Sequence, residues 1–306
     1  MSAPEPRGAE LRGAASREDA PRDAAPRTHA GHGRLEFEVV RDRTVIGAMR
    51  AESPLKVLAP RNHGHGAWVF AATFGGGLVA GDAIDLHVRV AEGACALIGT
   101  QASTKVYRCA DETTRQDLTA RVDAGATLVI LPDPIVCFAG ARYEQRTRVE
   151  LSPDATLVLA DTLTAGRSAR GERWDFARYV SRLHIVRRQP SSSREVTPLV
   201  LDATLLDPAH GDLRARMGRF DAISAVLLVG PKARAMRESA LADAHVNGKP
   251  TLARGADLRV ATSAIGEDAA LVRIAGTSVE TVTRAVRTVL AGLPDLLGDD
   301  PFARKW

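Results

Sequence analysis

Short segments in which polar and apolar residues alternate recur about every 10–15 residues over most of this chain, and they constrain its fold more than any other feature. In the segment 83–90, Ile84, Leu86, Val88 and Val90 fall on one face of an extended chain, and the polar residues between them fall on the other. The predicted strands are 35–40, 44–49, 54–58, 67–73, 83–90, 95–100, 117–122, 127–132, 142–151, 156–163, 178–186, 197–206 and 269–276.

One unit of this pattern occurs twice. The segments 88–98 (VRVAEGACALI) and 120–130 (ARVDAGATLVI) each consist of a polar strand, a short turn with an acidic residue and a glycine, and an apolar strand. We interpret each unit as a repeated hairpin. Because no helical segment lies between these strands, the sequence predicts an all-β sandwich, barrel or coil rather than a sheet with alternating helices.

Helix signals appear only near the end of the chain. The segment 231–247 begins with a proline and carries an apolar stripe at helical spacing. The segment 277–293 has a stronger signal, because Thr277 and Glu280 have the spacing of a capping box and Gly292 marks an end. The expected fold is therefore mainly β: a coiled, layered β-sheet scaffold with about two α-helices in its C-terminal third.

Residues 1–33 have a different composition from the rest of the chain. They are rich in Ala, Pro, Gly and Arg and contain almost no large apolar side chain. Such a segment cannot bury enough apolar surface to offset the entropy lost on ordering. We therefore expect a disordered tail over 1–33 and, because 34–306 contains no evident linker, a single β-rich domain over those residues.

Composition also limits the class of protein. Cys95, Cys109 and Cys137 lie far apart without a C-x-x-C motif, which is typical of a reducing cytosol and disfavours a disulfide framework or a thiolate zinc site. No apolar run approaches the ~18–20 residues of a membrane span, and the N-terminus lacks the apolar core of a secretory signal. A net charge of +4 spread along the chain, with 4% aromatic residues, disfavours a nucleic-acid surface. We expect a soluble cytoplasmic protein.

A glycine-rich segment, FGGGLVAGD (74–82), concentrates unusual backbone chemistry. It is not a phosphate-binding Walker loop, because no Gly-Lys-Ser/Thr follows, and a strand pattern rather than a helix follows it, unlike a dinucleotide loop. Two interpretations of Gly75, Gly76, Gly77 and Gly81 remain open. They form a tight turn that needs positive φ angles, or they let the backbone approach a partner closely.

Three carboxylates are the first candidates for chemistry. Asp82 ends the glycine-rich segment, and Asp161 and Asp202 each interrupt an apolar strand, where a carboxylate needs a partner or a metal ion. The simpler interpretation is that each accepts hydrogen bonds from a nearby turn or pairs with an arginine such as Arg167 or Arg170. Neither interpretation is excluded by the sequence.

The loop 62–66 (NHGHG) places His63 and His65 two residues apart. Imidazole together with carboxylate suits Ni²⁺ or Zn²⁺, and two histidines at this spacing can reach one cation. Two histidines alone are a weak signal, and a solvated loop without a ligand is the simpler interpretation.

Several motifs resemble those of a known family, the urease accessory protein D family, also called UreD or UreH. The segments that resemble its motifs are GGGLVAGD (75–82), TQASTKVYR (100–108), LPDPIVCFAGARYEQ (131–145) and ADTLTAGRSARGERWDF (160–176), with PLKVLAP (54–60) and LVRIAGTSVETV (271–282) towards its ends. The resemblance covers about 34–293 and follows the family's order and spacing.

The resemblance implies a fold and a function. It implies an all-β scaffold with a coiled, layered sheet and two helices that is not an enzyme. It implies binding to apo-urease, to the helical accessory protein F and, through the complex, to the nickel-carrying GTPase accessory protein G. It further implies that the chain helps to deliver Ni²⁺ to the urease active site through an internal polar passage, with nickel bound transiently and no permanent cofactor.

The resemblance also assigns roles to single residues. Asp82, Asp161 and Asp202 match family positions and become candidates for the nickel passage. Thr104 and Lys105 match the motif that lines or supports it.

One loop departs from the family pattern. The family often has acidic residues before the glycine motif, where this chain has Arg61, His63 and His65. This difference makes His65 a substitute candidate for binding nickel.

The expected partner surface combines the four glycines with Arg167 and Glu172. Two other functions stay open at this point. One is a metal-dependent hydrolase that uses Asp82, Asp161 and His65 on a single metal ion. The other is a pure docking module, formed by the glycine-rich segment and residues 166–175, that never contacts nickel.

Overall fold

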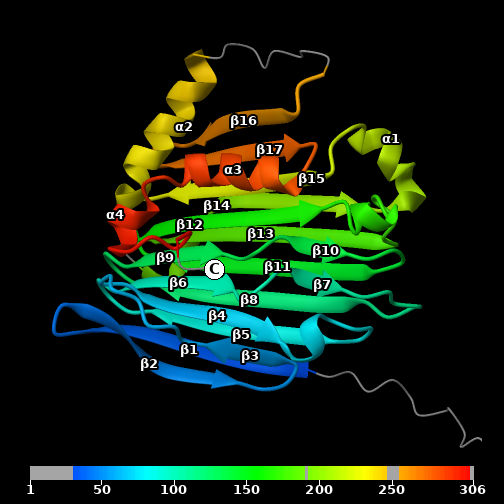
Figure 1. The fold of residues 1–306 in the computed structure, drawn as a ribbon. Coiled ribbons are helices and arrows are strands. Elements are labelled where there is room, and N and C mark those ends of the chain that lie inside the picture. The colour runs from blue at the N-terminus through cyan, green and yellow to red at the C-terminus, as the bar shows by residue number, and fades with distance from the viewer. Residues whose placement is uncertain (1–29, 190–191, 247–254, 304–306) are drawn as a thin grey trace, which may run out of the picture.

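Two β-sheets stacked face to face form the body of the molecule in a computed structural model that describes residues 30–189, 192–246 and 255–303 (Figure 1). The first sheet has seven strands in the order β14-β13-β11-β8-β5-β1-β2, and the main run of the second has the order β16-β17-β15-β12-β9-β6-β4-β3. The strands of the first sheet are β1 (Ala30–Val40), β2 (Arg43–Ala51), β5 (Ala83–Val90), β8 (Thr114–Val122), β11 (Arg142–Leu151), β13 (Arg178–Gln189) and β14 (Ser192–Leu206). Those of the second are β3 (Leu55–Leu58), β4 (Ala67–Thr73), β6 (Cys95–Thr100), β9 (Thr127–Leu131), β12 (Thr156–Thr164), β15 (Ala222–Val229), β16 (Leu258–Ile265) and β17 (Ala269–Gly276), with the short β7 (Thr104–Val106) and β10 (Ile135–Cys137) beside them.

The mainly β architecture is confirmed, and every predicted strand overlaps an observed one. The interpretation of the repeated unit as a hairpin is wrong. β5 and β6 lie in different sheets, and each pairs in parallel with the equivalent strand of the next unit, β8 and β9. The turn between β5 and β6 therefore crosses from one sheet to the other, and successive units stack as coils.

Backbone hydrogen bonds hold the stacked turns together. The amide of Asp123 donates to the carbonyl of Val90 at 2.9 Å, and the amide of Ser152 donates to the carbonyl of Val122 at the same distance. The composition of the strands explains why the chain passes from one sheet to the other. Strands of the second sheet, such as β6, are buried along their whole length, whereas strands such as β5 bury only alternate side chains.

Apolar side chains form two buried cores. One core fills the space between the sheets, and a second lies between the second sheet and the C-terminal helices. The helices are α1 (Leu213–Met217), α2 (Arg234–Val246), α3 (Val279–Val289) and α4 (Leu293–Leu297), of which α2 and α3 contact β15 and β17 (Figure 1). The two predicted helices correspond to α2 and α3, and the short α1 and α4 were not predicted.

The predicted ends of α3 are corrected by the structure. Ser278, not Thr277, is the N-cap, because its side-chain oxygen accepts the amide of Thr281 at 3.2 Å. Thr277 instead donates its amide to the carbonyl of Asp257. The helix ends at Val289, and Gly292 precedes α4 rather than ending α3.

The N-terminal strand begins earlier than expected. β1 starts at Ala30 and pairs in parallel with β5 from that residue, so the last four residues assigned to the tail belong to a sheet. Gly31 also lets β1 pass close to the turn before β3, since a Cβ there would come within 2.8 Å of the carbonyl oxygen of Glu52. Residues 1–29, where the rest of the tail was predicted, lie outside the described residues.

All three cysteines are free thiols and buried, as the sequence predicted for a chain without disulfides. Burial raises the pKa of Cys95 to about 11, which keeps that thiol protonated at neutral pH. Among the described residues, no helix has the length and apolar character needed to cross a membrane.

Candidate functional site

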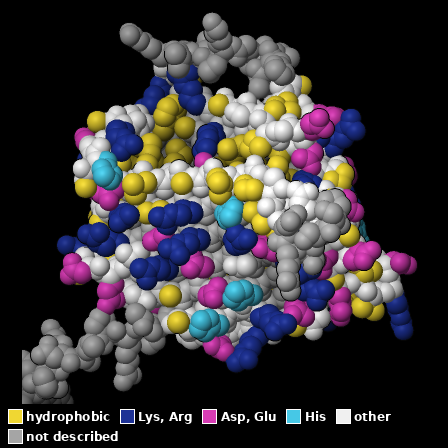
Figure 2. Space-filling model, turned by 180° about the vertical axis from the view of Figure 1, so that it is seen from behind, with side chains coloured by type: hydrophobic (Ala, Val, Ile, Leu, Met, Phe, Trp, Pro, Cys, Tyr) yellow, Lys and Arg dark blue, Asp and Glu magenta, His cyan; other side chains and the backbone are white. Residues whose placement is uncertain are grey.

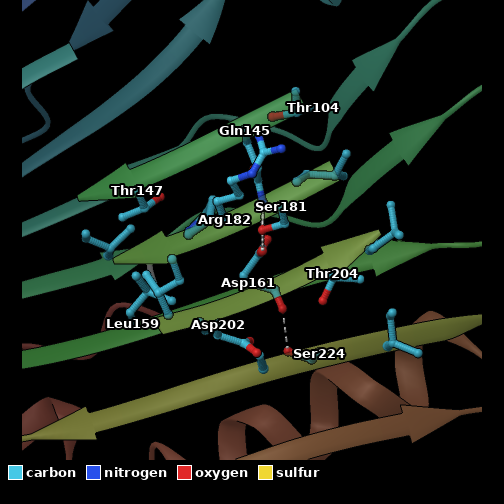
Figure 3. A pocket seen from close by; sticks show the side chains of 18 of the residues that line it. Thr104, Gln145, Thr147, Leu159, Asp161, Ser181, Arg182, Asp202, Thr204 and Ser224 are labelled. Carbon is cyan, nitrogen blue, oxygen red and sulfur yellow. Dashed lines mark hydrogen bonds between the residues drawn. The ribbon is translucent and has the colours of Figure 1, made fainter. Parts of the chain in front are cut away.

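A cavity of about 420 Å³ lies between the two sheets, where β8, β11, β13 and β14 face β12, β15 and β17 (Figure 3). Apolar residues form much of its wall, but one row of polar side chains crosses it. Gln116, Gln145, Ser181 and Thr204 are register partners on four neighbouring strands, and all four line the cavity. Because the side chains of register partners point to the same face of a sheet, these four form a continuous polar row along the coil axis.

Asp161 faces this row from β12 on the opposite sheet. Its Oδ2 accepts hydrogen bonds from Nε2 of Gln145 at 2.6 Å and from Oγ of Ser181 at 3.2 Å. Burial in the interior raises the pKa of Asp161, and the nearby Asp202 carboxylate raises it further, although the two hydrogen bonds oppose this rise. Asp161 is therefore an interior carboxylate, partly exposed to the cavity, whose hydrogen-bond partners Gln145 and Ser181 are uncharged.

Two tyrosines continue the network on the first sheet. The hydroxyl of Tyr143 donates to Oε1 of Gln116 at 3.0 Å and also lies 3.3 Å from Oε1 of Gln145, while Nε2 of Gln145 donates to the hydroxyl of Tyr179 at 3.2 Å. Burial raises the pKa of both tyrosines well above its ordinary value, so both hydroxyls keep their protons at neutral pH. The glutamines are thereby fixed in orientation, with Gln145 pointing its donor at Asp161.

Asp202 lies on β14 at the edge of the sheet, and it lines the end of the cavity that lies at this edge. Its Oδ1 accepts a hydrogen bond from Nη2 of Arg273 on β17 at 2.7 Å, which joins the two sheets across the cavity. The Asp202 side chain is 20% exposed and that of Arg273 is 53% exposed, so solvent reaches the pair.

A smaller cavity of about 110 Å³ adjoins the first on the side of the glycine-rich segment. Gly76 and Ser103 line the smaller one only, whereas Thr104 and Gln116 line both. The two cavities therefore meet at Thr104 and Gln116. Together they make a series of polar positions from the glycine-rich segment to Asp161 and Asp202.

Only some of the predicted site residues lie in this series. Asp161, Asp202 and Thr104 line the larger cavity. Asp82 does not: it is 5% exposed, and its Oδ2 accepts the amide of Val79 at 2.9 Å, which closes the turn after the glycines. Lys105 has an exposed side chain and lines neither cavity.

The histidine loop lies elsewhere. The carbonyl of His65 accepts the amide of Thr44 at 2.9 Å, and the loop packs on the end of α4, where a Cβ on Gly298 would come within 2.8 Å of Nδ1 of His65. Among the described residues no group of three or more His, Cys, Asp and Glu side chains could hold a metal ion. The hydrolase hypothesis needs such a group from Asp82, Asp161 and His65, and the structure does not bring these three together.

The glycines meet two different local needs. Gly75, Gly76 and Gly81 have φ angles of 79°, 75° and 79°, which confirms the prediction of a turn with positive φ. Gly77 has an extended backbone, and a Cβ there would come within 2.5 Å of the ring of Tyr107 and 2.8 Å of the carbonyl oxygen of Lys105. The close backbone approach that the sequence suggested therefore occurs within the chain, against β7.

Arg167 and Glu172 bind each other. Nε of Arg167 donates to Oε2 of Glu172 at 2.8 Å, the same oxygen accepts the amide of Ala139, and the guanidinium lies 4.1 Å from the ring centre of Phe138. These contacts anchor the loop after β12 to the end of β10. Arg170 is exposed on that loop and does not pair with Asp161, whose hydrogen-bond partners are Gln145 and Ser181.

The outer face of the seven-stranded sheet carries charges of both signs (Figure 2). Glu144 pairs there with Arg146 and Arg182, and His87 lies 3.1 Å from Asp85 on an exposed stretch of β5. Such neighbouring opposite charges largely cancel at a distance and give no single-sign field. The polar groups in the cavity instead form hydrogen bonds with one another across the two sheets, which distinguishes the cavity from this hydrated face.

Sequence reasoning missed Gln116, Gln145, Ser181 and Arg273. A signal for three of them was present. Gln116, Gln145 and Ser181 each stand next to a charged residue near the start of a polar strand, in RQD, EQR and SR, at equivalent places in successive coils. An alignment of the coils with one another would have found them.

Comparisons with known proteins agree with the resemblance seen in the sequence. The family model described as UreD urease accessory protein matches residues 29–306. Urease accessory protein UreD of Sorangium cellulosum (strain So ce56) is 54% identical over 90% of this chain and 85% of its own length. UreD of Anaeromyxobacter sp. (strain Fw109-5) is 40% identical over 90% and 89%, and urease accessory protein D of Arabidopsis thaliana is 32% identical over 89% and 99%. The chain belongs to the UreD family of urease accessory proteins.

Proposed function

We propose that this protein supports urease maturation by conducting nickel ions through the cavity between its sheets. It acts in the cytoplasm as a non-catalytic scaffold that binds apo-urease together with accessory proteins F and G. Nickel is the cargo of this process and not a resident cofactor. The membership of the UreD family supports the role in urease maturation, and the cavity supports the route.

The observation that carries the route is the interior Asp161 carboxylate, which faces the polar row from the opposite sheet. Burying a carboxylate among apolar strands costs free energy even when hydrogen bonds compensate, so it is a poor way to stabilise a fold. Within the part of the chain that the structure describes, the side-chain hydrogen-bond partners of Asp161 are Gln145 and Ser181, and both are uncharged. Neither partner carries a positive charge that competes with a passing cation. A divalent cation that reaches the carboxylate oxygens favours their ionised form, which opposes the effect of burial on the pKa.

The dispersed arrangement of oxygen atoms suits conduction better than storage. A closed structural metal site binds with about 10–16 kcal/mol, and each 1.4 kcal/mol changes affinity about tenfold, so such a site releases its ion slowly. Here the carboxylates of Asp161 and Asp202, the amide oxygens and the hydroxyls are spread along the cavity, without a cluster of three strong ligands among the described residues. Weak successive contacts allow an ion to enter and to leave.

The test replaces Asp161 by Asn in a urease activation assay with accessory proteins F and G and a defined nickel supply. We expect urease that is poor in nickel and weakly active, while the variant still co-purifies with apo-urease. Asp117→Asn is the matched control. It replaces an aspartate by asparagine in the same way, on β8, and Asp117 does not line the cavity. Normal nickel content with Asp161→Asn would reject the route and favour the pure docking module.

A further inference from the structure

One ion pair spans the cavity at the edge of the molecule. Asp202 lies on β14, the last strand of the first sheet, and Arg273 lies on β17 of the second sheet, next to the last strand β16. The 2.7 Å contact between Nη2 of Arg273 and Oδ1 of Asp202 therefore connects the two sheets where the interior reaches solvent. Both residues line the cavity (Figure 3 labels Asp202).

The two cavity carboxylates differ in the charge of their partners. Asp161 accepts hydrogen bonds from an amide and a hydroxyl, whereas Asp202 accepts one from a guanidinium. The carboxylates are close enough for Asp202 to raise the pKa of Asp161. A divalent cation at this end of the cavity therefore meets the oxygens of both carboxylates together with the positive charge of Arg273.

A guanidinium and a divalent cation compete for the same carboxylate oxygens. While Arg273 holds Asp202, a cation at this end of the cavity meets a like charge and a neutralised ligand. The Arg273 side chain is more than half exposed, and solvent-exposed ion pairs contribute little to stability, so the pair can open readily.

We propose that Arg273 is a tethered counter-ion that closes the Asp202 end of the cavity and is displaced by the divalent cation that passes. This inference rests on the proposed function, and it adds the residue that controls one end of the route. Arg273 keeps the affinity of Asp202 for cations low, so an ion is released there instead of being held between the carboxylates of Asp161 and Asp202.

The experiment measures binding of Ni²⁺ alone to the full-length protein by equilibrium dialysis at fixed pH and ionic strength. Replacing Arg273 by Gln removes the competing charge, and we expect nickel to bind about tenfold more tightly, the order expected from one unit charge near the site at partial solvent screening. Arg273→Lys keeps the charge and is expected to bind nickel within about twofold of the unaltered protein.

Two further variants locate the effect. In an Asp202→Asn background, Arg273→Gln is expected to change nickel affinity by less than about twofold, since the carboxylate for which it competes is gone. Arg219→Gln is the matched control, because Arg219 pairs with Asp257 at 2.6 Å outside both cavities. Circular dichroism verifies that each variant is folded, and Arg273→Met replaces Arg273→Gln if the latter is not.

Each outcome decides the question. Tighter binding by Arg273→Gln that disappears in the Asp202→Asn background supports the inference. Unchanged or weaker binding overturns it, as does a lack of detectable binding in both proteins or an equal gain with Arg219→Gln. The proposed route is judged separately, by the nickel content of urease activated with Asp161→Asn, so the counter-ion role can fail while the route stands.

Discussion

Gln145 and Asp161 join the two sheets through a hydrogen bond of 2.6 Å in the middle of the cavity. Tyr143 and Tyr179 hold the Gln145 amide on its own sheet, so its donor is already oriented when it meets the carboxylate. A pre-oriented partner reduces the cost of keeping Asp161 in the interior.

Replacing Gln145 by Leu removes this bond and leaves part of the Asp161 carboxylate without a donor. We expect the free energy of unfolding to fall by about 1–3 kcal/mol, the usual cost of leaving a buried acceptor unsatisfied. Urea denaturation followed by circular dichroism measures the change. The same substitution in an Asp161→Asn background should cost clearly less, and equal losses in both backgrounds would show that the two side chains are not coupled.

A second ion pair links the turn of one coil to a distant strand. Arg188, which is buried, donates to Oδ1 of Asp123 at 2.9 Å, and Arg121 donates to the same oxygen at 3.1 Å. Burial alone would raise the pKa of Asp123, but the hydrogen bonds and charges of these arginines hold it below its ordinary value. The folded protein therefore binds a proton at Asp123 less readily than the unfolded chain does.

The lowered pKa of Asp123 determines how its contribution to the stability of the fold changes with pH. Asp123 stabilises the fold above the pKa of the unfolded chain, near 3.8, and this contribution is lost as pH falls through the lower pKa of the folded state. We expect Asp123→Asn to lower the free energy of unfolding by about 1–3 kcal/mol at pH 7, since Arg188 loses its charge partner. The difference from the unaltered protein should shrink below about pH 4. Denaturation curves at several pH values measure it, and a difference that grows on acidification would contradict the assignment.

The sequence predicted what depends on local pattern. Alternation located strands such as β5 and β11 residue by residue, because burial of one face imposes a period of two. It missed β15, an almost continuous apolar run, since periodicity does not distinguish a strand buried on both faces from other buried segments.

Contacts between distant segments could not be predicted in this way. The acidic residue of the DAG turn looked like a turn marker, yet Asp123 binds Arg188, 65 positions later. Asp202 and Arg273 are 71 positions apart and meet only because β14 and β17 face each other across the cavity. Asp161 and Asp202 were found as carboxylates out of place in apolar strands, whereas Asp82, selected because it ends the glycine-rich segment, closes a turn.

The glycine-rich segment allows a comparison between two substitutions. Gly77→Ala would place a Cβ within 2.5 Å of the Tyr107 ring and 2.8 Å of the Lys105 carbonyl oxygen, so β7 or the glycine turn must shift. Gly75→Ala meets no neighbouring atom within 4 Å and costs only the strain of a positive φ, about 1 kcal/mol. We expect Gly77→Ala to cost about 1–3 kcal/mol and to lower the melting temperature further than Gly75→Ala. The reverse order in a thermal melt would show that this contact yields easily.

The junction between the two cavities offers the most direct test of the route that does not alter a charge. Thr104 lines both cavities, and Thr104→Val keeps the shape of the side chain while replacing a hydroxyl by a methyl group. A hydrated cation loses a polar contact where the cavities meet, so we expect urease activation to slow several-fold while co-purification with apo-urease is unchanged. Thr119→Val is the matched control, since Thr119 is a register partner of His87 and Arg148 on the outer face of the same sheet as Gln116. Equal activation rates for Thr104→Val and Thr119→Val at limiting nickel would place the route away from this junction, and slowing by both would indicate a general effect on the fold.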